Sequence, residues 1–482
     1  MTTKTAPDDA STTFLSRVDR YFSISSRGSN FPREIRGGVV TFVAMAYIVI
    51  LNPIILSGSA DVAGNSLGFT QVAAVTALTS GVMTILFGLV SRLPFAFAAG
   101  LGINSFLAVS VVGQVTWPEA MGLVAINGLI IVLLSATNLR RLIFDAVPMQ
   151  LKVAITVGIG LFIAFIGLVD AGFVTATGFA SPPVGLGVGG SIATIPTLIF
   201  VVTLLLTGVL VARRVKGALL IGILVSTVIA VIVESFAKLG SGVENAGGWS
   251  LSVPVLPSDI FSVPDLSLVG AISFTSFERI GALAAMMLVF TLVFTNFFDA
   301  MGTMTGLSKE SGLADANGNF PRLKSALIVE GVGAIAGGVT SSSSNTVFIE
   351  SGAGIGEGAR TGFANLITGV LFLLAMFLTP LTTIVPSEVA GAVLVIVGAM
   401  MMSQIKEIDW SEFAVSLPVF LTVAVMPLTY SIANGIGAGF IAWVVLQSLS
   451  GRAKKISPLL WAVAGGFAIF FARGPLETLI GA

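Results

Sequence analysis

The feature that most constrains this 482-residue chain is its succession of long apolar runs separated by short polar breaks. A helix rises about 1.5 Å per residue, so about 20 apolar residues cross a hydrocarbon layer about 30 Å thick. About fourteen runs have this character, and they lie near residues 37–57, 70–90, 95–112, 119–138, 149–170, 193–212, 217–235, 280–301, 323–340, 345–357, 362–381, 387–403, 411–431 and 434–450. In lipid only helices or closed barrels satisfy every backbone polar group, and the sequence lacks a barrel's short alternating strands. The runs therefore predict an all-α integral membrane protein.

Composition removes several classes of function. Charged residues make up only 10% of the chain, whereas a soluble domain has about 25%. The 24 basic and 24 acidic residues cancel, which gives no support for a nucleic-acid partner. The chain has no His and no Cys, so it cannot use disulfides, thiol nucleophiles, imidazole bases or Cys/His metal sites. We expect a protein that is not an enzyme, needs no cofactor, and moves any proton on Asp, Glu or water.

The basic residues predict an orientation. If the N-terminus is cytoplasmic and every run crosses, nearly all of the 24 basic residues fall on the cytoplasmic side, where they are favoured. The outer loops keep only Lys238 and Arg279, and Arg473 follows the last apolar stretch. The polar N-terminal tail also lacks the apolar core of a secretory signal. We expect a multi-pass protein of the plasma (cell inner) membrane with both termini in the cytoplasm.

A polar stretch divides the runs into two equal sets. The predicted parts are a cytoplasmic tail (1–36), a first half (37–236), an extracellular linker (237–279), a second half (280–450) and a C-terminal tail (451–482). An odd number of spans in each half inserts the second half in the opposite sense, which predicts a seven-plus-seven inverted repeat. The tail holds a short apolar segment, 458–472, whose place in the membrane the sequence leaves open.

Segments three and ten are short and interrupted by Gly or Ser clusters. Asn104 in the third and Asn345 in the tenth lie beside these small residues. In secondary transporters, paired interruptions in corresponding segments mark the substrate site near the midplane. The alternative is that the glycines only let helices pack closely. Because the interruption occurs in both halves, we favour a substrate site.

Three acids lie within predicted spans, namely Asp299, Glu330 and Glu350. An acid near the bilayer centre costs about 2.5–3.5 kcal/mol and marks a functional site by default. The runs place no Lys or Arg at the same depth, so we interpret Asp299 and Glu350 as groups that bind and release protons and hydrogen-bond a polar substrate. Asp299 could instead face cytoplasmic water at a helix end, and Glu330 could serve packing or capping.

An aromatic heterocycle with ring N–H and C=O groups would suit such a site. Carboxylates accept from N–H groups, the amides of broken helices donate to C=O groups, and Phe97, Phe297 or Phe348 could stack on the ring. The Gly-rich stretch 352–358 lacks the Lys and Ser/Thr of a phosphate-binding loop. Glu357 and Arg360, three residues apart, predict a solvated ion pair.

Four motifs carry a resemblance to a known family. They are NFPREIRGG at 30–38, AGLGIN at 99–104, FDAMGT at 298–303 and SNTVFIES at 344–351. Over about residues 30–450 the chain resembles the purine nucleobase permeases, the hypoxanthine–guanine–adenine branch of the nucleobase–cation symporter superfamily. The resemblance implies a core domain of segments 1–4 and 8–11, a gate domain of segments 5–7 and 12–14, short strands in segments three and ten, and a homodimer. It also implies proton-driven uptake of hypoxanthine, guanine or adenine.

The resemblance also assigns residues. Substrate-binding acids of the family map onto Asp299 and Glu350, and its segment-three motif maps onto Gly102 and Asn104. Relatives commonly carry an acid where Asn296 stands and Thr where Ala300 stands, which leaves the proton stoichiometry and the preferred purine open. The predicted substrate site comprises Glu350, Asp299, Asn345, Asn104, Gly102, Phe348 and Asn296, with Glu350 and Asp299 also coupling the proton.

Three alternatives remain beside purine symport. An anion carrier of similar architecture would need Arg or Lys at membrane depth to hold its substrate. A passive nucleobase channel would not accumulate substrate against a gradient. An intramembrane enzyme would need a nucleophile and base, or a metal arrangement, that this composition does not offer.

Overall fold

The structure, a computed structural model, describes residues 14–137, 146–314 and 320–472. Parts of both predicted tails lie outside these residues, as does Arg473. The first half contains α1 (Phe14–Phe22), η1 (Ser25–Arg27), α2 (Phe31–Met45), α3 (Ile48–Ser57), α4 (Phe69–Ser91), β1 (Phe97–Ala99), α5 (Leu101–Phe106), η2 (Leu107–Val111), α6 (Trp117–Ala136), α8 (Met149–Asp170), β2 (Val174–Ala176), β3 (Val184–Leu186), α9 (Ile195–Ala212) and α10 (Ala218–Ala237).

The second half begins after a long connection that carries one short helix, α11 (Ser276–Ile280). It contains α12 (Ala282–Glu310), α13 (Leu323–Thr340), β4 (Asn345–Val347), α14 (Ser351–Gly356), α15 (Phe363–Ala375), η3 (Met376–Ile384), α16 (Ser387–Met402), η4 (Ser403–Glu407), α17 (Phe413–Leu428), α18 (Ile432–Gln447), η5 (Ser448–Arg452), η6 (Ala453–Lys455) and α19 (Pro458–Phe471).

The helices confirm a multi-pass membrane protein. Among the described residues, 11 helices are long and apolar enough to cross a membrane. Three shorter apolar helices span Leu101–Val111, Phe413–Leu428 and Pro458–Phe471. The predicted run near 345–357 contains only β4 and α14. Helix α12 continues to Glu310 rather than ending near residue 301, so that prediction was wrong at its C-terminal end.

Local chemistry explains where the first span begins and breaks. The Asn30 side chain accepts a hydrogen bond from the Arg33 N–H, and Pro32 occupies the first turn, so α2 begins at Phe31, inside the predicted polar tail. The span then breaks between Met45 and Ile48, and α3 carries Pro53 in its interior. Tyr47 lies at this break, which interrupts the run predicted near residues 37–57.

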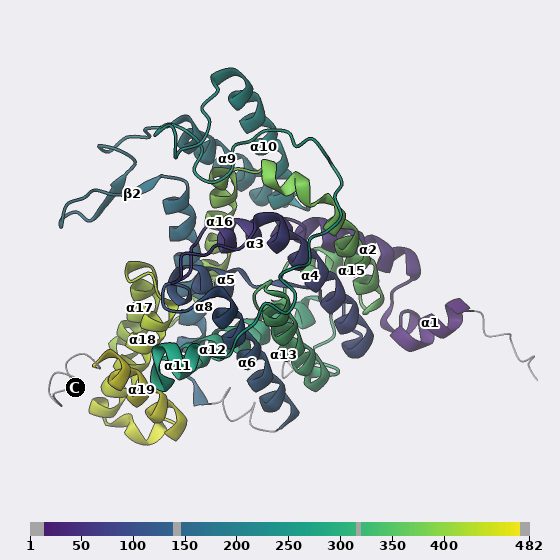
Figure 1. The fold of residues 1–482 in the computed structure, drawn as a ribbon. Helices are drawn as coiled ribbons and strands as arrows, with labels where there is room; N and C mark the ends of the chain where they lie inside the picture. The colour runs from purple at the N-terminus through teal and green to yellow at the C-terminus, as the bar shows by residue number, and fades with distance from the viewer. Residues whose placement is uncertain (1–13, 138–145, 315–319, 473–482) are drawn as a thin grey trace, which may run out of the picture.

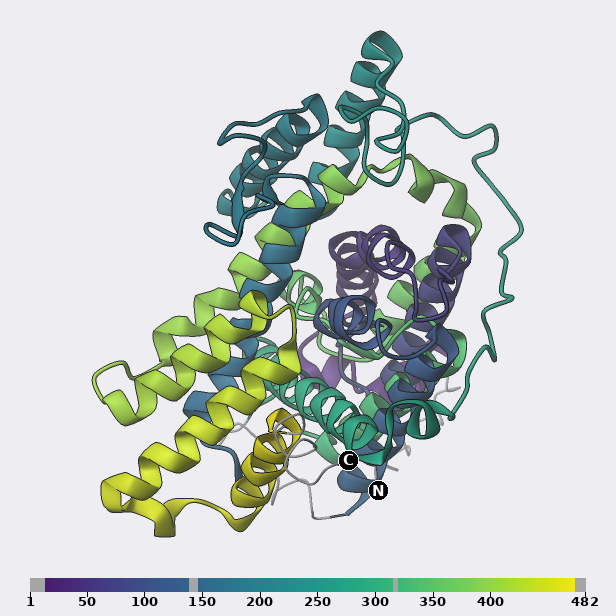
Figure 2. The same cartoon turned by 60° about the vertical axis from the view of Figure 1, so that its left-hand side comes forward.

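The spans form two bodies, defined by which helices pack together (Figures 1 and 2). In the first, called the core here, α6 packs on α13, α4 on α15, and α2 on α14 and α15. In the second, called the gate here as a label only, α8 packs on α16 and α17, α9 on α10 and α16, and α17 on α18. Figure 2 shows the long gate helices side by side along one flank, with the core on the other.

Glycine allows the central gate helices to approach closely. A Cβ atom added to Gly398 of α16 would lie 2.3 Å from the carbonyl oxygen of Gly160 on α8, and one added to Gly167 would lie 2.4 Å from that of Gly391. No larger residue fits there without moving a backbone. The α8–α16 contact is therefore fixed by two glycine pairs.

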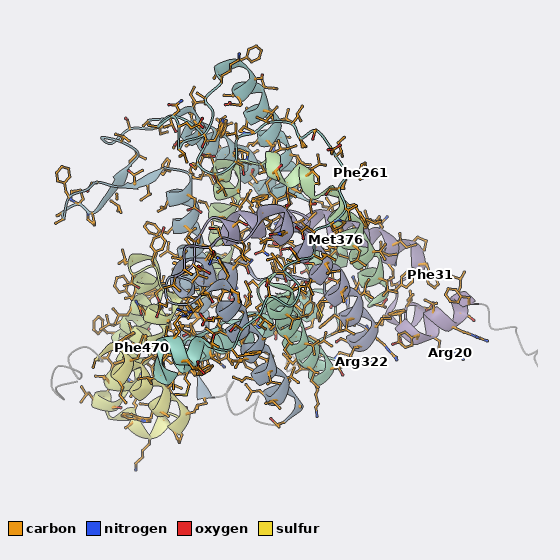
Figure 3. All side chains as sticks on the ribbon, viewed as in Figure 1. Arg20, Phe31, Phe261, Arg322, Met376 and Phe470 are labelled. Atoms are coloured by element: carbon orange, nitrogen blue, oxygen red, sulfur yellow. The ribbon has the colours of Figure 1, made fainter. Side chains whose placement is uncertain are left out.

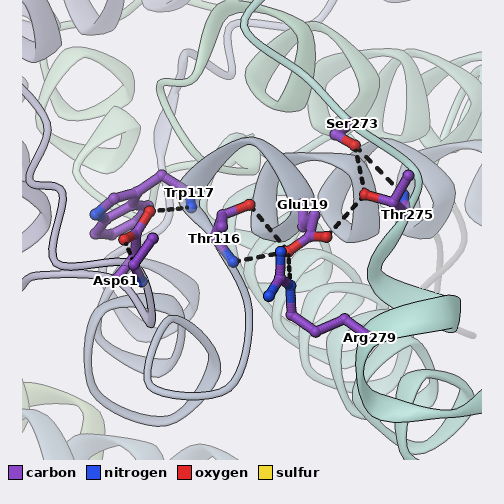
Figure 4. A network of polar contacts seen from close by, with 8 residues as sticks. Asp61, Thr116, Trp117, Glu119, Ser273, Thr275 and Arg279 are labelled. Atoms are coloured by element: carbon purple, nitrogen blue, oxygen red, sulfur yellow. Dashed lines mark hydrogen bonds and ion pairs between the residues drawn. The ribbon is translucent and has the colours of Figure 1, made fainter.

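The connection between the halves is anchored to the core by a polar network (Figure 4). Arg279 of α11 donates to Glu119 of α6 over 2.7 Å, and the same carboxylate caps the first turn of α6 through Thr116. Asp61, in the loop after α3, accepts from the Trp117 N–H. Burial raises the pKa of Asp61, but hydrogen bonds from the amides of Trp117, Asn65 and Ala63, together with the charge of Arg279, outweigh it, and the pKa lies below its ordinary value.

The two ends of the described chain lie at the periphery. Helix α1 is amphipathic, and its Arg20 side chain is exposed, as is Arg322 just before α13 (Figure 3). At the other end, α19 buries Leu460 and Phe467 and packs on α18 and α12. The apolar segment 458–472 is thus a helix attached to the bundle, at 14 residues shorter than a normal span.

Candidate functional site

The centre of the core is a two-stranded sheet. Strands β1 and β4 run antiparallel, with Phe97 opposite Val347 and Ala99 opposite Asn345. The strands expected in segments three and ten are thus present, and they pair with each other. The pairing extends beyond the strands, because the Phe348 N–H donates to the Ala96 carbonyl and the Gly100 N–H to the Ser344 carbonyl. Two unwound segments can lie within the bundle because each satisfies the other's backbone.

Glu350 lies three residues beyond the end of β4, at the N-cap position of α14. Its side chain is half-buried, and its Oε1 accepts a hydrogen bond of 2.5 Å from the Tyr47 hydroxyl. Tyr47 is fully buried at the break between α2 and α3. Tyr47, in a broken span of the first half, therefore orients Glu350, in a broken span of the second half.

Asp299 lies within α12, eleven residues before the helix ends at Glu310, and its side chain is half-buried. This excludes the alternative that it occupies a helix end. Helix α12 packs on α14, whose N-cap residue is Glu350. The structure thus places the two predicted acids on neighbouring elements.

Glu330 is fully buried on α13, and its Oε2 accepts the Val347 N–H at 3.3 Å. It therefore positions β4 next to the predicted site. This contact favours the structural interpretation of Glu330 that the sequence left open.

One cation lies beside the helix that carries Asp299. The Nζ atom of Lys152, near the start of α8, lies 5.6 Å from the centre of the Phe298 ring, and Phe298 is the neighbour of Asp299. Among the described residues, Arg36 and Lys216 pair with Glu357, Arg279 with Glu119 and Arg452 with Glu412.

The three predicted asparagines are all fully buried. Asn296 of α12 donates to the Ser344 hydroxyl at 3.0 Å, and Asn345 of β4 donates to the Ser342 hydroxyl and the Ser343 carbonyl. These two meet at the turn that precedes β4. Asn104 of α5 has no hydrogen-bond partner for either amide atom among the described residues, so its polar group is available to a ligand.

The remaining predicted residues lie in different surroundings. Gly102 of α5 faces the gate, because a Cβ added there would lie 2.8 Å from the Ile159 side chain of α8. Phe348 is buried in the main apolar cluster. Phe97 packs on Phe87, with ring centres 4.9 Å apart, in a separate cluster of the core. Phe97 is therefore committed to packing and is a poor stacking partner for a substrate.

A cavity of about 330 Å³ reaches Glu350 between core and gate. It is lined by Glu350 and Ala353 from the core, by Met400 of α16, and by Arg214 and Lys216 from the loop between α9 and α10, among other residues. This loop lies on the side that the basic residues predict to be cytoplasmic. A polar molecule can thus reach the Glu350 carboxylate between the two bodies.

An ion-pair cluster lies beside this cavity, and it corrects a prediction. Glu357 does not pair with Arg360; it pairs with Arg36 of α2 at 2.7 Å and with Lys216 of the gate loop. Arg360 instead donates to the carbonyls of Ile355 and Ala359. A spacing of three residues favours a pair only within a regular helix, and α14 ends at Gly356.

Sequence reasoning missed Tyr47 as a site residue. Its signal was present, because the chain has only 3 tyrosines and this one lies inside an apolar run. The break that positions it follows from no strong local signal, since Pro53 lies within α3 rather than at the break.

Comparison with known proteins now identifies the family. The sequence profile of the Permease family matches residues 32–438. The chain is 37% identical to the guanine/hypoxanthine permease PbuG of Bacillus subtilis over 456 residues, which cover 94% of this chain and 98% of the relative. It is 33% identical to the adenine permease AdeP of Escherichia coli over 451 residues, covering 93% and 94%.

Solved structures share the fold at low identity. The transmembrane domain of the cyanobacterial bicarbonate transporter BicA matches with a TM-score of 0.59 and 16% identity, covering 84% of this chain and 97% of that one. The murine anion transporter Slc26a9 in its inward-facing state matches with a TM-score of 0.57 and 12% identity, covering 93% and 74%. Such identities establish a shared fold and leave the substrate to the closer relatives. The chain therefore belongs to the Permease family of nucleobase and ascorbate transporters, as a membrane permease rather than an enzyme.

Proposed function

We propose that this protein imports purine nucleobases such as hypoxanthine, guanine and adenine across the plasma membrane, driven by protons. The observation that carries the proposal is the position of Glu350: a half-buried acid at a broken span, hydrogen-bonded to Tyr47 and reached by a cavity. Relatives named as guanine/hypoxanthine and adenine permeases support the substrate class. The predicted orientation, with both termini in the cytoplasm, would place the cavity mouth inside the cell.

The chemistry follows from the two acids. In its ionised form Glu350 would accept a ring N–H of the base, while the orphaned amide of Asn104 could pair with a ring carbonyl or nitrogen. A proton shared between Asp299 and Glu350 would relieve the repulsion of two carboxylates on the neighbouring elements α12 and α14. Binding and release of this proton would then accompany binding and release of the base. Relatives commonly have an acid where this chain has Asn296. Because an amide does not titrate, one fewer group near the turn before β4 can bind a proton.

Alternating access would arise from movement between core and gate. The packing pattern supports the seven-plus-seven repeat on which this depends: α6 packs on α13 as α4 packs on α15, and α8 packs on α17 as α16 packs on α9. Each contact maps onto its counterpart when the halves are exchanged. The site lies in the core and the cavity between the bodies, so a rigid shift of the core against the gate would move the base from one side to the other. We further propose, from the family resemblance, that the protein works as a homodimer.

The test uses Glu350→Gln, which keeps size and one acceptor but removes the charge and the proton. In a host lacking its own purine permeases, wild type should accumulate labelled hypoxanthine, guanine or adenine, and a protonophore should abolish the accumulation. Glu350→Gln should lower uptake about 100-fold or more, consistent with losing a charged hydrogen bond to substrate together with the coupling step. The matched control is Glu244→Gln, on the exposed connection between the halves, which should leave uptake unchanged.

Uptake that persists in Glu350→Gln at wild-type membrane levels would remove this acid from the mechanism. Equilibration without accumulation would indicate a passive channel instead of a symporter. Transport of bicarbonate but no purine would favour the anion-carrier alternative.

A further inference from the structure

The segment between α18 and α19 turns sharply and carries three cations. Gly451 interrupts η5 with a φ angle of 76°, a left-handed conformation that glycine adopts without strain. Arg452, Lys454 and Lys455 follow within four residues of this turn. The turn therefore decides where these three positive charges lie relative to the gate helices.

A cavity of about 380 Å³ lies where this turn meets the ends of the gate helices α8, α17 and α18. Its volume is within the range of small-ligand sites, about 300–1,000 Å³. Arg452 and Lys455 line the cavity, but Lys454 does not. Ser457 and Ala146 also line it, and the Ser457 hydroxyl donates to the Ala146 carbonyl at 3.0 Å, which ties the start of α19 to the chain before α8.

The charge around this cavity is positive. Among the described lining residues, Arg452 and Lys455 are cations and none is an acid. The N-terminal ends of α8, α17 and α19 also reach the cavity, through Pro148, Val415 and Ser457 respectively. A helix N-terminus carries partial positive charge, whereas α18 alone presents its C-terminal end here. The cavity therefore favours an anion.

The two cations are held differently. The Arg452 guanidinium pairs with the carboxylate of Glu412, the N-cap residue of α17, which lies outside the cavity lining. Because a guanidinium has five N–H donors, this pair orients Arg452 and leaves donors for a ligand. Lys455 is exposed and makes no ion pair among the described residues.

Two buried side chains of α18 add neutral donors. Gln447 is 6% exposed and Trp443 is 9% exposed, and both line the cavity. Gln447 donates one amide hydrogen to the Ala414 carbonyl at 3.3 Å, so its second remains for the cavity. The Trp443 indole N–H makes no hydrogen bond within the part of the chain that the structure describes. Cations and neutral donors together suit a group with several anionic oxygens, and a guanidinium matches phosphate in particular.

We propose that this cavity binds a phosphate group, carried by an anionic phospholipid of the cytoplasmic leaflet. The basic residues predict that this end of the gate faces the cytoplasm, where basic pockets between membrane helices bind lipid head groups. Phe413 and Leu449, close to the lining residues in sequence, are 70% and 84% exposed and would contact acyl chains. The site does not depend on the proposed purine substrate or on proton coupling.

The test titrates the delipidated full-length protein in detergent, without purine, and follows its melting temperature. Phosphatidylglycerol should raise the melting temperature saturably, whereas phosphatidylcholine, which has no net charge, should not. Lys455→Gln should weaken the phosphatidylglycerol affinity about 5-fold, because a basic residue near anionic lipid contributes about that factor. Arg452→Gln should weaken it at least as much, and Lys455→Gln keeps the test valid if loss of the Glu412 pair impairs folding.

The matched control is Lys454→Gln, which removes the same charge from the same segment but lies outside the cavity lining. It should leave the phosphatidylglycerol affinity unchanged. A parallel titration with inorganic phosphate at constant ionic strength separates the two sources: saturable stabilisation that Lys455→Gln weakens, with no response to the lipid, would assign the cavity to free phosphate. Equal responses to the two lipids and none to phosphate would overturn the site. Equal losses in Lys454→Gln and Lys455→Gln would also overturn it, because they would indicate a diffuse basic surface.

Discussion

Single side chains decide the chemistry of the site. Glu350 is held by one hydroxyl, that of Tyr47, which reaches it from a different broken span. A hydrogen bond to a charged group contributes about 1.5–3 kcal/mol, so this contact is strong enough to fix the rotamer of the acid. The geometry predicts that binding depends on Tyr47 even if Tyr47 never touches the base.

The corresponding prediction concerns Tyr47→Phe, which removes only the hydroxyl. The carboxylate loses its donor and its fixed orientation, so we expect the KM for purine uptake to rise about 10-fold or more. Uptake kinetics in cells with matched membrane levels would check this. The control is Tyr21→Phe, because Tyr21 donates to the Leu89 carbonyl at the surface of the core, far along the chain from the acid. Unchanged kinetics in Tyr47→Phe would show that Glu350 is oriented without it.

At the scale of elements, close helix packing replaces polar contacts as the main source of order. Helix α8 meets α16 through the pairs Gly160–Gly398 and Gly167–Gly391. In lipid, helices gain little from excluding water, so association depends on van der Waals contact over a close approach. The same logic applies where Gly128 of α6 meets Gly331 of α13 in the core.

We predict that Gly398→Ala destabilises the protein although alanine is the better helix former. The added methyl would lie 2.3 Å from the Gly160 carbonyl oxygen, and overpacking of this kind costs about 1–3 kcal/mol, more than the roughly 1 kcal/mol gained in helix propensity. The melting temperature in detergent should fall by several degrees. Gly208→Ala on α9, where an added methyl meets nothing within 4 Å, should be neutral or slightly stabilising. Equal effects of the two substitutions would contradict the packing argument.

At the scale of the whole molecule, the two bodies share an apolar contact, because one buried cluster includes both Phe348 of the core and Phe440 of the gate. Within each body the helices pack extensively, whereas α5 meets α8 and α2 meets α10 over small areas. The pair between Glu357 of the core and Lys216 of the gate adds a polar contact on one side. The proposed alternating access requires the two bodies to shift as rigid units along this contact.

A disulfide across this contact should stop transport reversibly. Gly102→Cys in the core with Ile159→Cys in the gate places the two side chains in contact, since a Cβ at 102 would lie 2.8 Å from the Ile159 side chain. The chain has no native cysteine, so only the two introduced cysteines can form a disulfide. Oxidation should reduce uptake to background, and a reductant should restore it.

The control crosslink lies within the gate. Gly391→Cys with Ala171→Cys places two Cβ atoms about 3.5 Å apart, which suits a disulfide, and both residues move together in our proposal. Its oxidation should leave uptake unchanged. Full transport with the core–gate crosslink formed would exclude a rigid shift between the bodies.

The sequence by itself determined the class of molecule and much of the element pattern. Long apolar runs and a shortage of charge leave no alternative to membrane helices, and the acids Asp299 and Glu350 within those runs predict a functional site because burial of charge is costly. These conclusions depend on local composition, which does not change when the chain folds. The match of the predicted runs to the observed helices follows from the same local rule.

Only the tertiary structure decided which groups meet. The bond between Tyr47 and Glu350, the partners of Glu357 and the bond from Asn52 to the Ser342 carbonyl join residues from different spans. Such contacts depend on how helices cross and where they break, and the hydropathy of a single span predicts neither. Local composition fixes what a segment can be, whereas long-range packing fixes what it touches, because a contact requires two segments to be placed at once.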